Sequence, residues 1–166
     1  VFAASGNNAS STQISSPACN SHTVAVGAVY DANIGYAGWT SCTDSATFAG
    51  KITCFTNSNN QLDILAPGAL IYGPDVGGGA DEYGGTSQAS PAAAGVAALM
   101  RQFNPSLTPD QVLGNLRSTG VNTTDTRNGL VFPLIDAEAA VTASLALNVT
   151  LSGPAWGLYT ETSGPR

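Results

Sequence analysis

The segment that constrains the fold most is residues 84–103, where two glycines lead into a long apolar stretch with a single charge. Such a stretch must be buried, and its alanines predict a helix from Ser87 to about Phe103, ended by Pro105. Pro91 fits this helix only if it lies in the first turn, where a missing N–H costs nothing. The segment therefore places Ser87 at or just before the start of a buried helix.

Two interpretations fit a serine at this place. Free N–H groups and the positive end of the helix dipole stabilise negative charge beside a serine oxygen, which suits a nucleophile. Alternatively, Thr86, Ser87 or Ser90 caps the helix, because Ser and Thr are favoured at that position. Gly84 and Gly85 allow a substrate or another backbone segment to come close, which favours the nucleophile.

Residues 1–4 predict a buried strand, and residues 5–8 predict the turn at its C-terminal end. Ligands collect at that end of the strands in open α/β sheets. Taken alone, Asn7 could be an ordinary turn residue, because Gly-Asn is common in turns. Combined with the Ser87 segment, its side-chain amide is better explained as a donor to a developing oxyanion.

Four segments together resemble the subtilisin-like serine peptidases. The sequence Gly-Thr-Ser-Gln-Ala-Ser-Pro at residues 85–91 resembles the nucleophile segment of that family. Residues 1–8, Val-Phe-Ala-Ala-Ser-Gly-Asn-Asn, resemble the strand and turn that carry the oxyanion-hole asparagine, which corresponds to Asn7. Residues 23–29 and 62–68 resemble two further family segments in the expected order.

The resemblance covers residues 1–145 and implies both a fold and a reaction. The fold is α/β, with three layers, a mostly parallel sheet and helices on both faces, present here as a partial domain. The reaction is endopeptidase hydrolysis of polypeptides through an acyl-enzyme, with Ser87 as nucleophile and Asn7 as oxyanion donor. The resemblance also places Ser16-Pro17 at a turn that is often cis in the family. The resemblance further implies that Ala3, Ala4, Ser5 and Gly6 form one wall of the primary specificity pocket, and that residues 8–17 form the other wall and the floor.

The chain lacks an evident general base for the serine. The family's triad runs in the order Asp, His, Ser. The single histidine, His22, lies between Pro17 and the strand predicted at residues 23–29, where the family has no catalytic residue. We therefore interpret His22 as a loop residue. Because a parallel strand such as residues 1–4 is normally preceded by a crossover, the Asp and His are expected on an upstream half of the domain, which would be this chain's partner.

Composition restricts the class of partner. Charged residues make up 10% of the chain, with a net charge of −6 and only five Lys and Arg. These cations do not cluster, which argues against nucleic acid. No run of about 18 apolar residues occurs, so no membrane-spanning segment is expected. A charge-poor surface rich in Ser, Thr, Asn and Gly is common in secreted enzymes, and an extracellular location is expected.

Cysteine usage is consistent with export. Cys42 and Cys54 bracket a polar, turn-rich segment, which favours a disulfide between them. Cys19 is then left over, either buried and inert or paired outside this chain. Zinc is disfavoured, since the chain has one histidine and no Cys-x-x-Cys pair.

No cofactor is expected, although structural calcium stays open. The acidic residues Asp31, Asp44 and Asp63 lack the dense spacing of a calcium loop and are interpreted as solvated turn acids.

Three alternatives to a peptidase were open. A catalytically incomplete or non-catalytic half that acts as a binding module has no reason to keep Ser87 and Asn7 together. An anion-binding helix N-terminus would need nearby cations, and none occurs between Lys51 and Arg101. An esterase of the α/β-hydrolase type would need Gly-x-Ser-x-Gly, but Ala89 replaces the second glycine.

The remaining elements are expected to form the scaffold. A capping box at residues 108–111 opens a helix to about Ser118, and Asp136 caps a helix to about Leu145. Residues 146–166 match no family segment and are interpreted as an edge segment or a linker. Strands are predicted at residues 1–4, 23–29, 62–65 and 69–72.

Overall fold

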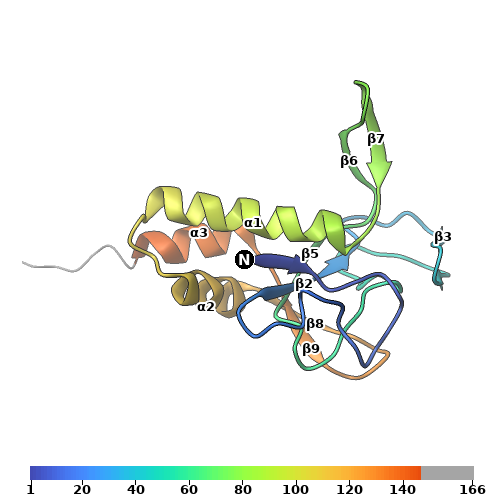
Figure 1. Cartoon of the computed structure of the whole chain (residues 1–166), viewed down its shortest axis with the longest axis horizontal. Helices are drawn as coiled ribbons and strands as arrows, with labels where there is room; N and C mark the ends of the chain where they lie inside the picture. The colour runs from blue at the N-terminus through green and yellow to red at the C-terminus, as the bar shows by residue number, and fades with distance from the viewer. Residues whose placement is uncertain (147–166) are drawn as a thin grey trace, which may run out of the picture.

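A five-stranded sheet forms the centre of the computed structural model, which describes residues 1–146 (Figure 1). The strand order is β1-β2-β5-β9-β8. The strands are β1 (Phe2–Ala4), β2 (Val24–Val29), β5 (Ile64–Pro67), β9 (Val131–Leu134) and β8 (Val121–Thr124). The first four run parallel, and β8 pairs antiparallel with β9. The predicted α/β class and mostly parallel sheet are confirmed.

The helices pack on one face of this sheet. They are α1 (Thr86–Phe103), α2 (Pro109–Thr119) and α3 (Ala137–Ala146). Their buried side chains share one hydrophobic cluster with Val26 of β2 and Ile64 of β5. The neighbouring strand residues Ala25 and Leu65 belong to a second cluster, because successive side chains of a strand point to opposite faces.

Loops cover the opposite face of the sheet. Ile14 and Ala18 from the segment after β1, and Ile52 and Leu62 from the segment before β5, pack there against Phe132 of β9. Helices were expected on both faces, but the helices within residues 1–146 lie on one face only. The physical reason is that the apolar stripes of all three helices meet the same set of strand side chains.

Helix α1 agrees with the prediction except at Pro91. The helix begins at Thr86, one residue earlier than predicted, and ends at Phe103 as predicted. Pro91 is its sixth residue, so its predicted place in the first turn is wrong. Proline has no N–H to donate to the Ser87 carbonyl four residues earlier. The helix continues because one face of it, with Ala89 and Ala93, is fully buried in the core.

The starts of α2 and α3 follow the predicted caps. The Thr108 hydroxyl accepts a hydrogen bond from the Gln111 backbone N–H, and the Gln111 side chain accepts one from the Thr108 N–H, at 3.3 and 2.9 Å. The Asp136 carboxylate accepts a hydrogen bond of 2.9 Å from the Ala139 N–H. The capping box and the Asp136 cap are therefore confirmed.

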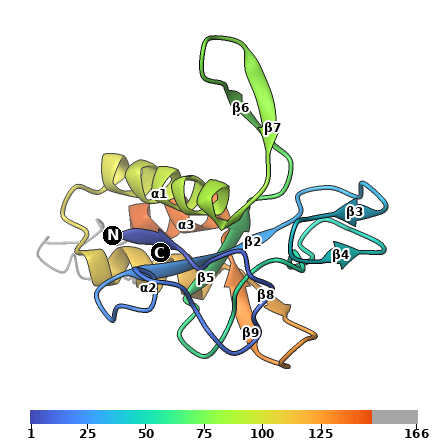
Figure 2. The same ribbon diagram turned by 45° about the vertical axis from the view of Figure 1, so that its right-hand side comes forward.

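Two hairpins lie outside the main sheet (Figure 2). One pairs β3 (Ala37–Gly38) with β4 (Thr43–Asp44), and the other pairs β6 (Ile71–Pro74) with β7 (Ala80–Tyr83). The strand predicted at residues 69–72 is β6, shifted by two residues, and β5 is shifted by two residues from the predicted 62–65. The remaining hairpin strands and the β8–β9 pair were not predicted.

The cysteines pair as the sequence favoured. A disulfide joins Cys42 to Cys54, with a Cα–Cα distance of 6.0 Å. Cys19 is exposed, which excludes the buried alternative and leaves pairing outside this chain open. The Ser16–Pro17 peptide is cis, as the resemblance implied. No helix within residues 1–146 is long and apolar enough to cross a membrane. The interpretation of residues 146–166 concerns residues beyond the described part, apart from the last residue of α3.

Candidate active site

The candidate site lies between the C-terminal end of β1 and the N-terminus of α1. Asn7 follows β1, and Ser87 is the second residue of α1. Thr86 joins the two segments, because the Asn7 side-chain oxygen accepts hydrogen bonds from both the backbone N–H and the hydroxyl of Thr86, each at 2.9 Å. Thr86, the residue before Ser87, therefore brings the two predicted catalytic residues together.

This contact fixes the direction of the Asn7 amide. With Oδ1 held by Thr86, Nδ2 is left to donate to another group. A Cβ atom placed on Gly85 would lie 3.1 Å from Nδ2 of Asn7 and 3.6 Å from the backbone nitrogen of Ser87. The Asn7 amide nitrogen and the backbone nitrogen of Ser87 thus lie near one point at the start of α1, where the Gln88 side-chain oxygen also lies, 3.0 Å away.

Thr86 also holds the turn that carries Asn7. Its side chain is fully buried, and its hydroxyl oxygen accepts a hydrogen bond of 3.1 Å from the Gly6 N–H. Gly6 has a φ of 106°, which favours glycine. Sequence reasoning considered Thr86 only as a possible cap. The N-cap is in fact Gly85, and no side chain caps the helix there, so the capping interpretation is wrong.

Asn57 shapes the loop that follows Asn7. Its side-chain oxygen accepts from the backbone N–H groups of Asn8 and Ser10, at 2.9 and 3.1 Å. Its amide nitrogen donates to the side chains of Asn8 and Ser15, at 3.2 and 3.1 Å. The sequence indicated only a turn at Asn57, because the partners lie more than 40 residues away. The buried side chain of Asn57 therefore holds the loop of residues 8–15 in place.

The predicted pocket-wall residues lie directly before Asn7 in the chain. Ala3 and Ser5 are buried, whereas Ala4 and Gly6 are partly exposed. The Ser5 hydroxyl has no hydrogen-bond partner within the described residues. A cavity of about 390 Å³ is lined by other residues, from the segments 44–54 and 123–127. The role of these four residues in substrate binding stays a prediction.

Ser87 itself is exposed, as a nucleophile must be. His22 is also exposed and lies in a turn, where its N–H donates 2.9 Å to the Asn20 side chain. His22 precedes β2 and Asn7 follows β1. Because these strands are parallel, His22 and the candidate site lie at opposite ends of the sheet. This placement agrees with the interpretation of His22 as a loop residue.

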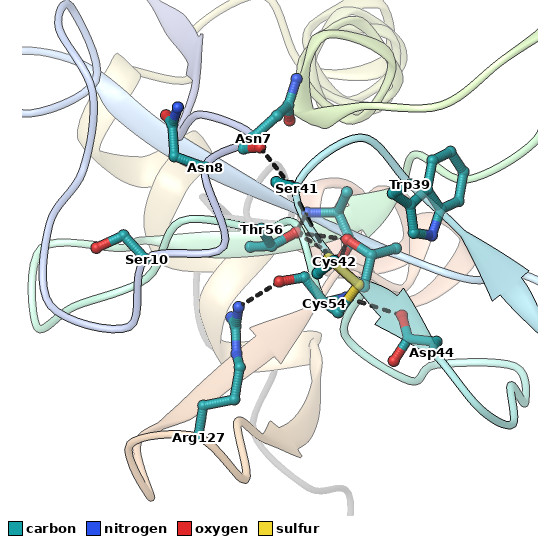
Figure 3. The surroundings of a disulfide bond; sticks show 12 residues. Asn7, Asn8, Ser10, Trp39, Ser41, Cys42, Asp44, Cys54, Thr56 and Arg127 are labelled. Carbon is teal, nitrogen blue, oxygen red and sulfur yellow. Dashed lines mark hydrogen bonds between the residues drawn. A yellow bond between two sulfur atoms is a disulfide. The ribbon is translucent and has the colours of Figure 1, made fainter.

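An ion pair between the partly exposed Arg127 and the buried Asp125 lies next to the disulfide. Figure 3 shows the hydrogen bond that joins Arg127 to the Cys54 carbonyl. The Arg127 guanidinium donates 2.6 Å to the Asp125 carboxylate and 2.7 Å to the Cys54 carbonyl. Burial by itself raises the pKa of Asp125, but the hydrogen bonds from Arg127 and Ser58 outweigh it and hold that pKa below its ordinary value. Asp125 is therefore ionised near neutral pH.

Comparison with known proteins shows that one family model covers every residue that the structure describes. The sequence model of the Subtilase family matches residues 1–147.

Two curated relatives share more than a third of their aligned residues with the chain. Subtilisin from Bacillus pumilus is 37% identical over 122 residues, which is 72% of this chain and 38% of the relative. Alkaline elastase YaB from Bacillus sp. (strain YaB) is 36% identical over 143 residues, or 84% of this chain and 32% of the relative. The chain thus spans about a third of the length of these relatives.

Solved structures agree with the sequence relatives. A cold-adapted subtilisin-like serine proteinase has a TM-score of 0.63 and 31% identity, covering 81% of this chain and 43% of that one. The patellamide maturation protease PatA has a TM-score of 0.65 and 27% identity, covering 88% of this chain and 52% of that one.

Proposed function

Because this chain belongs to the subtilase family, we propose that residues 1–145 form the C-terminal half of the catalytic domain of a secreted serine endopeptidase. Its substrates are polypeptides. One observation carries the proposal. Thr86 holds the Asn7 side-chain oxygen at the start of α1, which leaves Nδ2 to donate beside the turn that carries Ser87.

In the proposed reaction, the hydroxyl oxygen of Ser87 attacks the carbonyl carbon of the scissile peptide. Its proton passes to a histidine on the partner segment. The oxyanion accepts hydrogen bonds from Asn7 Nδ2 and the Ser87 N–H, aided by the dipole of α1. When the C–N bond breaks, the amine leaves with that proton and Ser87 carries the acyl group, which water then removes. These steps use protein groups alone and need no cofactor.

The histidine and its orienting aspartate are proposed to lie on an upstream segment of the same domain. In the described sheet β1 is an edge strand of three residues, paired on one side only. An upstream strand that pairs with β1 would cover this edge. The same strand would carry its own C-terminal end to the level of Asn7, where the catalytic groups are needed.

Substrate would run beside the strand β1 and the turn after it. Ala4 and Gly6 are partly exposed, so they are the members of the proposed wall that a substrate can reach. Both are small and uncharged. We therefore propose a primary pocket that accepts uncharged side chains.

Kinetics of the complete enzyme test the proposal. Ser87→Ala is expected to abolish turnover, because no nucleophile remains. Asn7→Ala is expected to lower kcat by about 100- to 1,000-fold with little change in KM, which is what loss of one such donor costs in a subtilisin. Thermal unfolding serves as the control: Ser87→Ala should keep the parent Tm, and Asn7→Ala should lower Tm by a few degrees, because it removes two hydrogen bonds from the buried Thr86, but should stay folded at the assay temperature. Unchanged kcat in either folded variant would refute the assigned role.

A further inference from the structure

We propose that the segment of residues 30–54, called here the Trp39 loop, is a positioning element for the oxyanion site, and that Trp39 is its main positioning residue. The loop reaches the site from two directions, through Trp39 at Gly84 and through Ser41 at Asn7. This inference rests on the proposed function, because it assumes that Asn7 stabilises an oxyanion.

The first contact is made on the turn before α1. A Cβ atom on Gly84 would lie 2.2 and 2.4 Å from Cζ3 and Cη2 of Trp39, far inside contact distance. The indole edge therefore lies directly on the Gly84 backbone and leaves no room for a side chain. Gly84 does not have a positive φ, so the close approach of the ring, and not the backbone conformation, requires glycine here. Two residues later, Thr86 holds the Asn7 amide.

The second contact is made on Asn7 itself. The hydroxyl of Ser41 donates a hydrogen bond of 2.9 Å to the Asn7 backbone carbonyl (Figure 3). Ser41 and Trp39 lie in the same turn between β3 and β4, which is closed by a 2.9 Å hydrogen bond from the Trp39 N–H to the Cys42 carbonyl. One turn of the loop thus contacts Asn7 and the backbone that leads to Thr86.

The indole of Trp39 is held by contacts on several sides, so it can keep the Gly84 backbone in one position. Its Nε1–H donates 2.7 Å to the hydroxyl of Tyr30. Its ring packs edge-on against Phe55, with centroids 4.7 Å apart and planes at 76°. The Cys42–Cys54 disulfide ties the turn that carries Trp39 to the residue beside Phe55. A ring held in this way resists displacement from Gly84.

Tyr30 is itself anchored by a buried acid. The Tyr30 hydroxyl donates 2.9 Å to the Asp44 carboxylate, which also accepts 2.9 Å from the Cys54 N–H and pairs with Lys51 at 2.7 Å. Burial, with the Asp44 contact, raises the pKa of the Tyr30 phenol, although the hydrogen bond from Trp39 partly offsets this. The phenol stays neutral across the working range of pH and keeps donating to Asp44.

Fixing the backbone near Asn7 is expected to affect the rate, because the reaction depends on the exact position of the oxyanion donor. A shift of about 1 Å in a catalytic group can cost about 100-fold in rate. Trp39 and Ser41 fix the backbone on both sides of the Asn7–Thr86 pair and touch no reacting atom in the proposed mechanism. They are therefore expected to change kcat through the position of the Asn7 amide, and to leave KM largely unchanged.

A double-mutant cycle in the complete enzyme tests this coupling. Trp39→Ala is expected to lower kcat about tenfold, with KM within about twofold of the parent value. In the Asn7→Ala background the same change should lower kcat much less, because the donor that Trp39 positions is gone. An equal fold-loss in both backgrounds would overturn the inference, since it would mean that Trp39 supports the fold in general.

Ser41→Ala keeps the test usable if Trp39→Ala fails to fold. Ser41 is exposed, so its removal should leave Tm unchanged while kcat falls a few-fold, again only when Asn7 is present. Thr40→Ala is the matched control, because Thr40 is an exposed neighbour in the same turn and should leave kcat unchanged. Equal kcat values for Ser41→Ala and Thr40→Ala would also overturn the inference.

The two hypotheses fail in different ways. If Asn7→Ala does not lower kcat, the proposed function fails. If Asn7→Ala lowers kcat as expected but either Trp39 or Ser41 fails to couple to it, only the positioning role fails.

Discussion

The Trp39 loop and the β6–β7 hairpin approach the same turn in opposite ways. The hairpin is joined to Gly84 by the chain, since β7 ends at Tyr83. The loop reaches Gly84 by contact alone, through the indole of Trp39. In Figure 2 both hairpins project from the body of the molecule, but only the β3–β4 hairpin contacts the site from its turn, through Trp39 and Ser41.

The two regions differ in how they are held. All four residues of β7 are exposed, and Val76 at the hairpin's tip is 98% exposed. The Trp39 loop instead contains the disulfide and the buried side chains of Tyr30 and Asp44. Packing and cross-links, and not adjacency in the chain, therefore determine which region can hold the turn before α1 in place.

The largest difference in kcat and stability is expected between alanine substitutions at two glycines, Gly84 beside Trp39 and Gly73 in the hairpin. Gly84→Ala would place a Cβ 2.2 Å from the indole, so we expect kcat to fall by about 100-fold and stability to fall by about 1–3 kcal/mol. Gly73→Ala in β6 is the matched control, because a Cβ there meets nothing within 4 Å. Steady-state kinetics and urea unfolding measure both effects. Similar losses at the two glycines would remove the basis of the comparison.

The disulfide should account for much of the loop's rigidity. Replacing Cys42 and Cys54 together by serine opens a short loop with a sequence separation of 12 and should lower the unfolding free energy by about 3 kcal/mol. Cys19→Ser controls for the loss of a sulfur atom, because this cysteine is exposed and unpaired within the described residues. Chemical denaturation of the complete enzyme provides the measurement. A loss as small as that of the control would mean that packing alone holds the loop.

The Asp125–Arg127 ion pair, which bonds to Cys54 of the Trp39 loop, is expected to make stability depend on pH. The folded-state pKa of Asp125 is lowered, so its stabilising effect is present above the ordinary Asp pKa of about 4 and is lost as pH falls through the folded-state value. Asp125→Asn should therefore lower Tm by several degrees at pH 7, and the difference from the parent should shrink toward pH 3.

Asp75 in the hairpin provides the contrast to Asp125. Its pKa is also lowered, by a hydrogen bond from Tyr83, but it is fully exposed, and Asp75→Asn should leave Tm nearly unchanged at both pH values. A pH-independent effect of Asp125→Asn would contradict the assigned ion pair.

The smallest effect is expected from shortening the hairpin. Replacing residues 75–79 by a two-residue Asn-Gly turn removes its glycine-rich tip and should change stability by no more than about 0.5 kcal/mol. A small peptide substrate should be cleaved with kcat within about twofold of the parent, because these residues contact neither Asn7 nor Gly84. A loss of kcat equal to that of Trp39→Ala would show that adjacency in the chain matters as much as packing.

The sequence predicted the site better than its supports. Ser87 and Asn7 were predicted because each lies in a local segment whose residues resemble a known family, and the structure brings these two segments together. The helix starts at Pro109 and Ala137 followed from capping residues that act within one turn. These signals are short in range, so they survive without knowledge of the rest of the fold.

The parts that were missed depend on contacts between distant segments. The hydrogen bonds between Thr86 and Asn7 join residues 79 positions apart, and nothing near Thr86 in the sequence distinguishes it from a helix cap. Trp39 meets Gly84 only in the folded molecule, and the one-sided helix layer depends on which strand residues the three helices share. Pro91 was misplaced because burial of the alanine face outweighs one missing hydrogen bond.

The most direct test of the central claim is the intact mass of this chain after the complete enzyme reacts with a serine-directed fluorophosphonate. The account predicts a single adduct, located on Ser87 by peptide mapping and absent from Ser87→Ala. A folded enzyme that hydrolyses peptides without an adduct on Ser87, or that carries its adduct on another residue of this chain, would contradict the assignment of Ser87 as the nucleophile.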